Sequence, residues 1–465
     1  MHRVIAALLL LGPVVHGQPE GPLVLAGGTI IDVSASGRSA HDVRDAVVVI
    51  RDGTIESVGA RASVRVPENS RVIDVAGAFI VPGLHDVFAT VNTQGQANAY
   101  LYMGVTSIVG LDEPGGRRGP LFLGAKPSPR VYRLESLTGY DESRLPPGER
   151  TIYDLTTRGR RLSDAELRAE IARLAADGVK VLLLYYTLGP DQVRVAAARA
   201  RDLGLATIGE LGATTYPEAM EAGVMAFVHT SRYSLELAPP ALRDEVAKAP
   251  FGPPRRRFYE FLAGLDADGP AVARYAKVLA SGPTGLIPTL AMNYLELPGH
   301  RNPWTEPAAA LLDPRDIHLP ANPVTGQQER PANAVRDGFP PGATAKLHAL
   351  EARYCRAGAK YLAGSGTDAF GTMAGISLHI ELEMLVKACL APRQALAAAT
   401  SNIGEAFGWS RVGQVKAGYE ADLLVLDADP VADIANLKRI RHVVLKGRLV
   451  DRQALLRTPV EQVRE

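Results

Sequence analysis

The sequence predicts a (β/α)8 barrel of the TIM type, with a small composite β-sandwich built from both ends of the chain. First, 465 residues are enough for a barrel of roughly 250 residues and an accessory module. Second, apolar runs alternate with helix-like stretches from residue 82 to residue 408, as in consecutive βα units. Third, short β-branched runs broken by glycine turns flank this region on both sides.

The predicted sandwich consists of residues 18–81 and residues 409–465. The first part contains LVLAGGTIIDV, DAVVVIRDGTIESVGA and RVIDVAGAFIV, and the second contains ADLLVLDADP and RIRHVVLKGRLVD. Val and Ile are enriched in these runs, and Asp-Gly and Lys-Gly pairs mark turns between them. Neither part has enough strands to bury a sheet face alone, so we expect them to form one module.

The barrel strands follow a Pro-Gly corner at residues 82–83. Each later strand follows a helix-like stretch, and the count reaches the eight that a closed parallel barrel requires. In chain order the strand segments are LHDVFAT, VTSIVGLD, RVYRLESL, GVKVLLLYY, LATIGEL, MAFVHTS, GLIPTL and KYLAGSGTDAF.

Two long stretches rich in proline and glycine interrupt this alternation. One surrounds FGPPRRRFYEFL, and the other runs from residue 298 to residue 342 and contains His300 and His318. Loops of this length in a compact domain are usually functional or disordered. Both follow strands, so we expect them at the barrel face where active sites form.

Composition limits the partners. Lys and Arg number 51 against 50 Asp and Glu, a net charge of +1, so no basic field favours nucleic acid or an anionic membrane. A small-molecule substrate is the expected partner, and the sequence leaves the oligomeric state open, a homo-oligomer included. Residues 1–17 have the charged, apolar and small-residue regions of a cleaved signal peptide, and no later stretch is apolar enough for a membrane span. We therefore expect an exported protein, periplasmic or secreted.

The chain has two cysteines, Cys355 and Cys389, both in helix-like segments. Export would permit a disulfide, but a barrel of this size does not need one. Because cysteine is among the most buried residue types, we expect two buried free thiols.

Several motifs resemble the amidohydrolase superfamily. PGLHDVFAT resembles the first barrel strand of that family, P-G-[LF]-[IV]-D-x-H-x-H, but Phe88 and Thr90 stand at the two histidine positions that bind metal. GVK, AFVH and GTDAF are most similar to an exported branch that includes imidazolonepropionase-like and prolidase-like proteins. SLHIELEMLVKACLAPRQALAAATSNIGEAFGW and GQVKAGYEADLLVLDADP resemble the family's last helices and its return into the sandwich.

The resemblance implies a metal site at the strand ends. In the family, a carboxylated lysine, two further histidines and an aspartate complete the ligands. The corresponding residues here are Lys180 in strand four, Glu210 in strand five, His229 in strand six and Asp368 in strand eight. With the strand-one histidines replaced, the resemblance implies a degenerate site.

Two arrangements remain open for this cluster. With a carboxylated Lys180, three negative groups and His229 would surround one divalent, zinc-like ion. If Lys180 is an ammonium, it would neutralise Glu210 or Asp368 and no metal would be required. We expect at most one metal ion, with none as the alternative.

The alternation of side chains along the first strand predicts which of its residues face the barrel interior. Residues at i and i+2 of a strand face the same way, so Asp86, Phe88 and Thr90 should share the inward face, and His85 should face outward. The expected role of Phe88 is then to fill barrel core.

Three functions are consistent with these residues. The first is a divergent hydrolase acting on a C–N bond, amide or cyclic amide, of a small substrate, with His300 or His318 completing a one-metal site. The second is a metal-free lyase or isomerase that uses Lys180, Glu210, His229 and Asp368 for acid–base chemistry. The third is a non-catalytic ligand-binding protein of the same fold.

Overall fold

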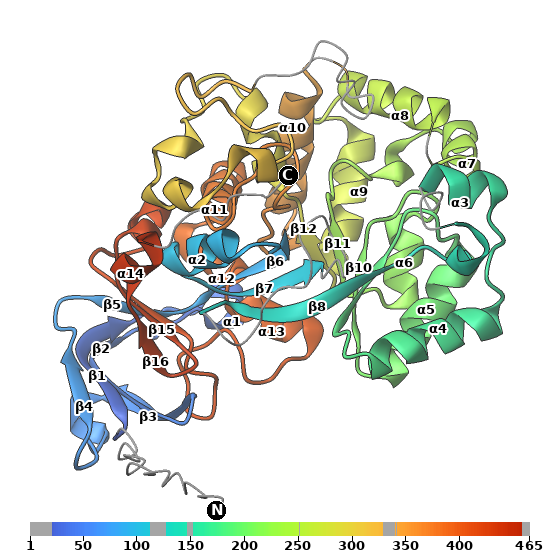
Figure 1. Ribbon diagram of the computed structural model, residues 1–465. Helices are drawn as coiled ribbons and strands as arrows, with labels where there is room; N and C mark the ends of the chain where they lie inside the picture. The colour runs from blue at the N-terminus through green and yellow to red at the C-terminus, as the bar shows by residue number, and fades with distance from the viewer. Residues whose placement is uncertain are drawn as a thin grey trace, which may run out of the picture.

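The structure is a computed structural model that describes residues 21–111, 127–146, 152–250, 252–328, 340 and 342–457. It contains two eight-stranded sheets, one rolled into a barrel and one forming a smaller module beside it (Figure 1). The predicted signal peptide, residues 1–17, lies outside the described residues, as do parts of the long segment 298–342.

The barrel sheet has the strand order β13-β12-β11-β10-β9-β8-β7-β6, and every neighbouring pair is parallel. The ends of the sheet meet where Val87 N–H donates to Ala363 O at 2.9 Å and Gly366 N–H donates to Phe88 O at 2.9 Å. The predicted (β/α)8 barrel is therefore confirmed. Its strands are β6 Leu84–Thr90, β7 Val105–Leu111, β8 Arg130–Leu137, β9 Val181–Leu184, β10 Ala206–Gly209, β11 Ala226–Val228, β12 Gly285–Ile287 and β13 Lys360–Tyr361.

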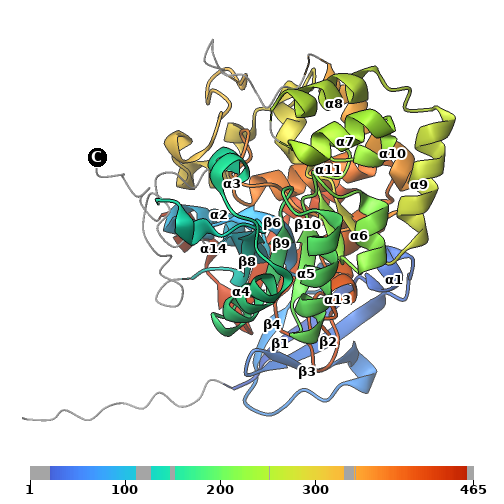
Figure 2. The same cartoon turned by 90° about the vertical axis from the view of Figure 1, so that its right-hand side faces the viewer.

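Helices surround this barrel and cover its outer face (Figure 2). Local signals start several of them: Ser163 with Glu166, and Thr215 with Glu218, form capping boxes. The helices are α2 Gln94–Tyr102, α3 Ile152–Arg158, α4 Asp164–Ala176, α5 Pro190–Asp202, α6 Tyr216–Ala222, α7 Pro240–Lys248, α8 Pro253–Gly264, α9 Pro270–Ser281, α10 Ala343–Arg356, α11 Ile376–Ala388, α12 Pro392–Ala398 and α13 Ser401–Phe407.

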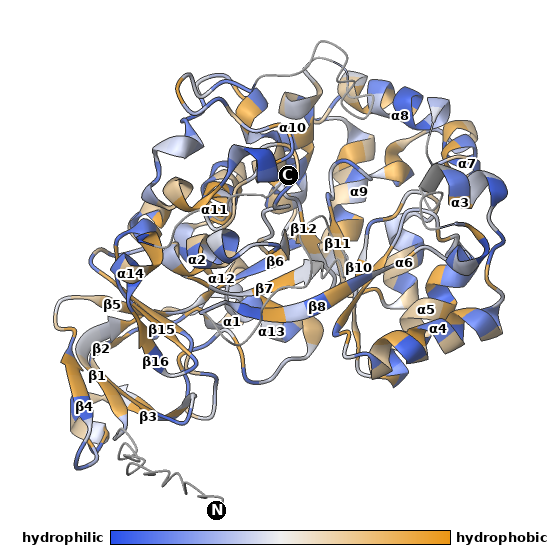
Figure 3. Ribbon diagram, viewed as in Figure 1, coloured by the Kyte–Doolittle hydropathy of each residue, from blue (hydrophilic) through white to orange (hydrophobic). Residues whose placement is uncertain are grey.

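Apolar residues fill both sides of the barrel wall. Figure 3 shows apolar strands in both sheets and polar outer faces on helices such as α4 and α5. Inside the barrel, Val109, Leu134, Leu183 and Ile208 belong to one buried cluster. Parallel strands that are apolar on both faces are expected when helices cover the sheet.

The second sheet joins the two ends of the chain, in the order β16-β15-β14-β5-β1-β2-β3, with β4 paired to β1. Leu423 of β14 pairs with Pro82 of β5 in an antiparallel register, so the C-terminal part extends the N-terminal part. The strands are β1 Leu23–Ile30, β2 Val43–Arg51, β3 Thr54–Ala60, β4 Arg71–Asp74, β5 Phe79–Pro82, β14 Leu423–Leu426, β15 Ile440–Leu445 and β16 Arg448–Val450; the short helices α1 Ser34–Gly37 and α14 Arg452–Leu456 adjoin them. The composite module that the sequence predicts is present.

The segment after β12 packs as four short 3-10 helices: η5 Leu290–Glu296, η6 Pro303–Thr305, η7 Pro307–Leu311 and η8 Pro314–Asp316. Most of its apolar residues, including Leu290, Ala308 and Leu311, are buried. This part of the long proline-rich loop is therefore a packed layer of the molecule.

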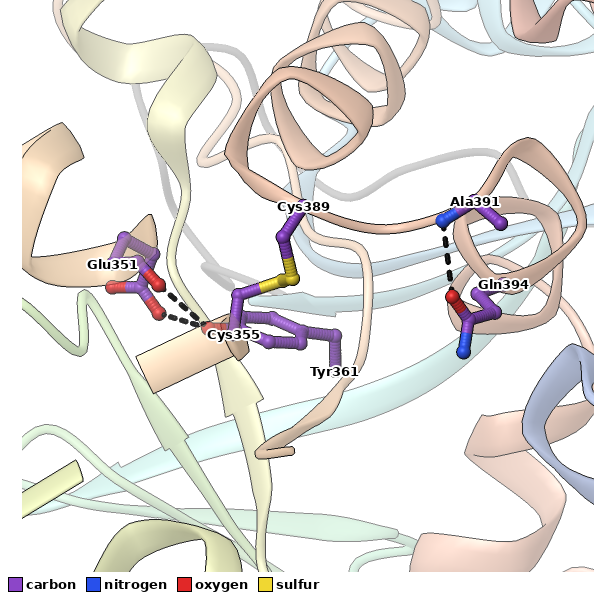
Figure 4. The surroundings of a disulfide bond; sticks show 6 residues. All are labelled: Glu351, Cys355, Tyr361, Cys389, Ala391 and Gln394. Atoms are coloured by element: carbon purple, nitrogen blue, oxygen red, sulfur yellow. Dashed lines mark hydrogen bonds between the residues drawn. A yellow bond between two sulfur atoms is a disulfide. The ribbon is translucent and has the colours of Figure 1, made fainter. Parts of the chain in front are cut away.

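The two cysteines form a disulfide, so the expectation of free thiols is wrong. Cys355 lies near the end of α10 and Cys389 directly follows α11, with 6.0 Å between their Cα atoms (Figure 4). The two helix ends approach within the distance that a disulfide spans. A separation of 34 residues in the chain gave no indication of this approach.

Candidate active site

Polar side chains gather at the C-terminal ends of three neighbouring barrel strands. Glu210 directly follows β10, His229 directly follows β11, and Thr289 lies two residues after β12. In (β/α)8 barrels, active sites form at this end from the segments that follow the strands. We therefore take this group as the candidate active site.

His229 is held in one tautomer. Its Nδ1 lies 2.6 Å from Thr289 Oγ1, and the Thr289 hydroxyl donates its only proton to Pro288 O, also at 2.6 Å. The hydroxyl can then only accept from His229, so the imidazole proton is assigned to Nδ1. Nε2 keeps its lone pair and lies 3.9 Å from Glu210 Oε1.

Glu210 begins a line of hydrogen bonds that leads away from His229. The Tyr233 hydroxyl donates to Glu210 Oε1 at 3.0 Å, and Arg255 Nη2 donates to the Tyr233 hydroxyl at 2.7 Å. The Arg255 guanidinium also lies 5.3 to 5.4 Å from the ring centres of Tyr186, Tyr233 and Tyr259. These cation–π contacts hold the arginine in place from several sides.

Burial sets the protonation state of these groups. It lowers the pKa of His229 well below 6.5, and the positive charges of Arg232 and Arg255 lower it further. Burial also raises the pKa of Tyr233 well above 10, although Arg255 opposes this shift. At neutral pH the site therefore contains an uncharged imidazole and a protonated phenol that donates to Glu210.

His229 and Thr289 both have left-handed backbone conformations, with φ values of 55° and 53°. Such conformations cost on the order of 1–3 kcal/mol for residues other than glycine. A β-branched threonine is especially disfavoured there. Two such residues in hydrogen-bond contact support a functional role for this corner of the barrel.

Phe88 packs beside this site, in the place where the family pattern has a metal-binding histidine. Its ring centre is 5.3 Å from that of His229 in an edge-on contact, and the ring packs against the inner barrel cluster. A Cβ added to Gly364 would come within 3.1 Å of Phe88. The phenyl ring thus occupies space between β6 and the β13 segment.

The other two residues of the first strand bind the segment that follows β13. Asp86 Oδ1 accepts from Ser365 N–H at 2.8 Å, and Thr90 Oγ1 donates to Thr367 O at 3.1 Å. Asp86 is fully buried, and its Oδ2 has no hydrogen-bond partner within the described part of the chain. Both polar side chains are thus engaged in closing the barrel.

His85 lies away from the candidate site. It is buried, and its Nδ1 contacts the Ser107 hydroxyl of β7. Burial lowers its pKa to about 4, and the charge of Arg130 contributes.

The structure does not bring Lys180 into the cluster, so its predicted place beside Glu210 and Asp368 is wrong. Lys180 is exposed and precedes β9, at the end of the barrel opposite to the candidate site. The inner cluster takes Val181, Leu183 and, partly, Tyr185 from this strand, so the side chain of Lys180 has the wrong parity as well as the wrong height. Neither a carboxylated lysine nor a buried ammonium is available to the site at this position.

Asp368 lies in the segment after β13 and is half-buried. Its carbonyl oxygen accepts from His318 N–H at 3.2 Å, and the His318 ring contacts Phe370 at 5.3 Å. His300 is engaged elsewhere in the loop, with Nε2 at 2.7 Å from Gly326 O. Of the predicted cluster, Glu210 and His229 lie together.

The donor set does not fit the metal centre that the family resemblance implies. Across the described residues, no three His, Cys, Asp or Glu side chains converge as metal ligands. The nearest arrangement is the pair of Glu210 and His229, and tight zinc sites use three or four protein ligands.

Sequence reasoning missed Thr289, Tyr233 and Arg255. Tyr233 follows His229 in the segment HTSRY, and Arg255 comes from the proline-rich stretch FGPPRRRFYEFL, which was expected near the site. The only signal for these residues was their position in segments after strands. Their pairing depends on how α8 packs beside the segment that follows β11.

Comparisons with known proteins agree with this fold. Residues 344–450 match the model of the amidohydrolase family. The matched part runs from α10 to the last strand of the β-module. No curated protein matches it in sequence.

Solved structures extend the likeness of fold to nearly the whole chain. A Xaa-Pro dipeptidase with bound methionine matches with a TM-score of 0.62 and 14% identity, over 92% of this chain and 100% of its own. A putative prolidase from Bifidobacterium longum matches with a TM-score of 0.60 and 20% identity, over 94% of this chain and 98% of its own. Molinate hydrolase matches with a TM-score of 0.61 and 18% identity, over 95% of this chain and 97% of its own. At these identities the likeness concerns the fold.

Proposed function

We propose that this protein hydrolyses a C–N bond, amide or cyclic amide, of a small molecule, with His229 as the general base. The observation that carries the proposal is the pair formed by His229 Nε2 and Glu210 Oε1, 3.9 Å apart. Both atoms are hydrogen-bond acceptors, so a donor placed between them would satisfy both. Hydrogen-bond lengths of about 2.8 Å put two acceptors of one water about 4 Å apart.

A water in this position would react in two steps. His229 Nε2 takes a proton from the water as its oxygen attacks the substrate carbonyl carbon, and Glu210 accepts the second hydrogen bond and orients the water. The same imidazole then gives the proton to the leaving nitrogen, so the C–N bond breaks into an acid and an amine. Thr289 keeps the imidazole in the required tautomer throughout.

A small cavity adjoins the site on the side of α8. It is lined by Tyr233, Arg255 and Tyr259, among others, and has a volume of about 10 Å³. Such a volume holds about one water molecule.

Neighbouring structures support the class of reaction. The proteins with the same fold include a Xaa-Pro dipeptidase, a molinate hydrolase and an ochratoxinase. We further propose that this chain holds at most one divalent ion, because at the described strand ends the donors that lie together are Glu210 and His229, too few for two ions. Elemental analysis of the purified protein measures this directly, and two ions per chain would contradict it.

The proposal is tested with a panel of dipeptides ending in proline, N-acyl amino acids and cyclic amides, by measuring amine release. With a substrate found, we expect His229→Gln to lower kcat at least about 100-fold, because general-base catalysis contributes about 10²–10⁴. Glu210→Gln should lower it as well, while circular dichroism remains that of the parent. The control is Lys180→Ala, which should leave both activity and stability unchanged because the lysine is exposed.

Two results would overturn the metal-free mechanism with His229 as the general base. One is full activity in His229→Gln. The other is activity that chelators abolish and zinc restores, since the steps above involve no metal. Binding of panel compounds without turnover would instead support the ligand-binding alternative.

The same pair also supports a second candidate, a metal-free lyase or isomerase. A neutral imidazole base next to a carboxylate and a phenol can move protons without adding water. The two reactions differ in the fate of the oxygen atom. Reaction in water labelled with oxygen-18 places the label in a hydrolysis product and leaves a lyase or isomerase product unlabelled.

We propose in addition that the protein is exported, as the pattern of residues 1–17 predicts. The link between Cys355 and Cys389 supports this, because disulfides persist mainly in oxidising compartments. The mature chain should then begin near Gln18, which mass spectrometry of protein from the native host would show. A retained Met1 would contradict export by this signal.

A further inference from the structure

A second cavity is lined by residues of the β-module, of β8 and of the segment after α13. The β-module itself lies far from α7 and α8 (Figures 1 and 2). The volume of this cavity is about 440 Å³, within the range of small-molecule sites. It lies at the start of β8, whereas Glu210 and His229 follow the ends of their strands. The residues that line it are Asp52, Gly53, Thr54, Arg130, Arg411, Glu420, Lys446 and Arg448.

Backbone hydrogen bonds fix the floor of this cavity. Ala421 N–H donates to Gly53 O, and Gly447 N–H donates to Ala421 O, both at 2.9 Å, so the β2–β3 and β15–β16 turns are joined through one residue. Gly447 has a φ of 76°, and a Cβ there would come within 2.9 Å of Gly53 Cα. Only glycine allows the turns to approach this closely. The lining is therefore in place before any ligand binds.

The charges of the cavity are unbalanced. Arg130 is already paired, with Nε at 2.6 Å from Asp422 and 3.2 Å from Glu420. Arg411 donates to Gly418 O at 2.8 Å and to Thr54 Oγ1 at 3.4 Å, and its charge also acts on the Glu420 carboxylate. Within the described ranges, neither Lys446 nor Arg448 has a carboxylate at ion-pairing distance. The lining thus has more cations than carboxylates: Arg130, Arg411, Lys446 and Arg448 against Asp52 and Glu420.

We propose that this cavity binds a small anion through its phosphate or carboxylate group. Arginine donors in a planar fork match the oxygens of both groups, and a lysine adds a compact positive charge. The ligand would touch Arg411 from the segment after the barrel and Lys446 and Arg448 from the β-module. It would therefore join the two parts of the molecule at a place remote from the candidate active site.

The probes are inorganic phosphate and citrate, titrated into the full chain by calorimetry, with sodium chloride at matched ionic strength as the reference. We expect saturable binding of at least one probe. Binding of phosphate alone identifies a phosphate ligand, and binding of citrate alone identifies a carboxylate. Because a charge-assisted contact contributes about 1.5–3 kcal/mol, Lys446→Gln and Arg448→Gln should each weaken binding about tenfold or more.

Two further variants separate binding from folding. Asp52→Asn removes an opposing charge and should tighten binding severalfold, a gain that a folding defect would not produce. Arg71→Gln removes an exposed arginine of β4, outside the cavity, and should bind like the parent. The proposal is overturned if neither probe binds more than chloride does, or if the variants of Lys446, Arg448 and Asp52 all bind like the parent.

Discussion

At the residue scale, the buried polar groups each depend on a small number of partners. Thr289 determines which nitrogen of His229 is free, and Tyr233 determines where Glu210 points. These contacts are short and buried, so an unpaired partner would cost about 1–3 kcal/mol. One methyl-for-hydroxyl replacement at Thr289 would thus change both the stability and the tautomer of the site.

Glu351 offers a prediction for stability against pH. This buried carboxyl accepts hydrogen bonds from Thr230 at 2.7 Å and Tyr361 at 2.9 Å, and burial raises its pKa from 4.5 to about 7. Between these two pH values the folded state holds a proton on Glu351 that the unfolded state has lost. The contribution of Glu351 to the free energy of unfolding is therefore fully present below about pH 4.5 and is lost as pH rises through 7.

Glu351→Gln removes this titration and keeps the size of the side chain. Its free energy of unfolding should fall less than that of the parent between pH 4.5 and pH 8, by up to about 3 kcal/mol. Urea unfolding of both proteins across that range measures the difference. Asp86, whose pKa burial also raises to about 7, remains in both proteins and cancels. Parallel pH profiles would show that Glu351 is ionised in the folded protein.

At the scale of elements, the disulfide links α10 to α11 around the strand that closes the barrel. The cysteines are 34 positions apart, and the chain between them includes β13 and the segment with Asp368. Joining them limits the freedom of the unfolded chain, an effect of about 3–4 kcal/mol for a loop of this length in the chain-entropy model. The link should therefore stabilise the part of the barrel that borders the candidate site.

Reduction tests this contribution. Dithiothreitol should lower the midpoint of thermal unfolding of the parent protein, because the unfolded chain regains its freedom. The Cys355→Ser/Cys389→Ser double variant should unfold at the lower midpoint in both conditions. If the parent and the double variant unfold alike without reductant, the disulfide does not stabilise the fold.

At the scale of the whole molecule, the two ends of the chain depend on each other. Leu423, Val425 and Val444 from the C-terminal part share one buried cluster with Leu25 and Ile50 from the N-terminal part. The C-terminal part of the module thus covers apolar surface of the N-terminal part. Separately, none of the described helices is long and apolar enough to cross a bilayer.

Truncation after Gly408 should therefore expose this cluster and the free edge of β5. The expected result is loss of soluble protein or of a single cooperative unfolding transition, measured by calorimetry. Supplying residues 409–465 as a separate chain should restore part of the transition, since the edge of β5 is a template for β14. A truncated chain that unfolds like the parent would show that the barrel does not need the module.

The sequence by itself determined the elements and their order. Period-2 runs and helical runs alternate clearly enough to predict eight barrel strands and a module from both ends, because periodicity is a local property. The same local reasoning placed Glu210 and His229 at strand ends. It also showed that Phe88 and Thr90 replace histidines of the family pattern.

Only the tertiary structure decided which side chains meet. Lys180 directly precedes its strand, at the entry end of the barrel, and its parity directs it away from the barrel core. Arg255 of α8 meets Tyr233, which bonds Glu210, because α8 packs beside the segment that follows β11, and the cysteines meet because two helix ends converge. These contacts join residues that are 22 and 34 positions apart. They depend on packing between elements, which local periodicity does not encode.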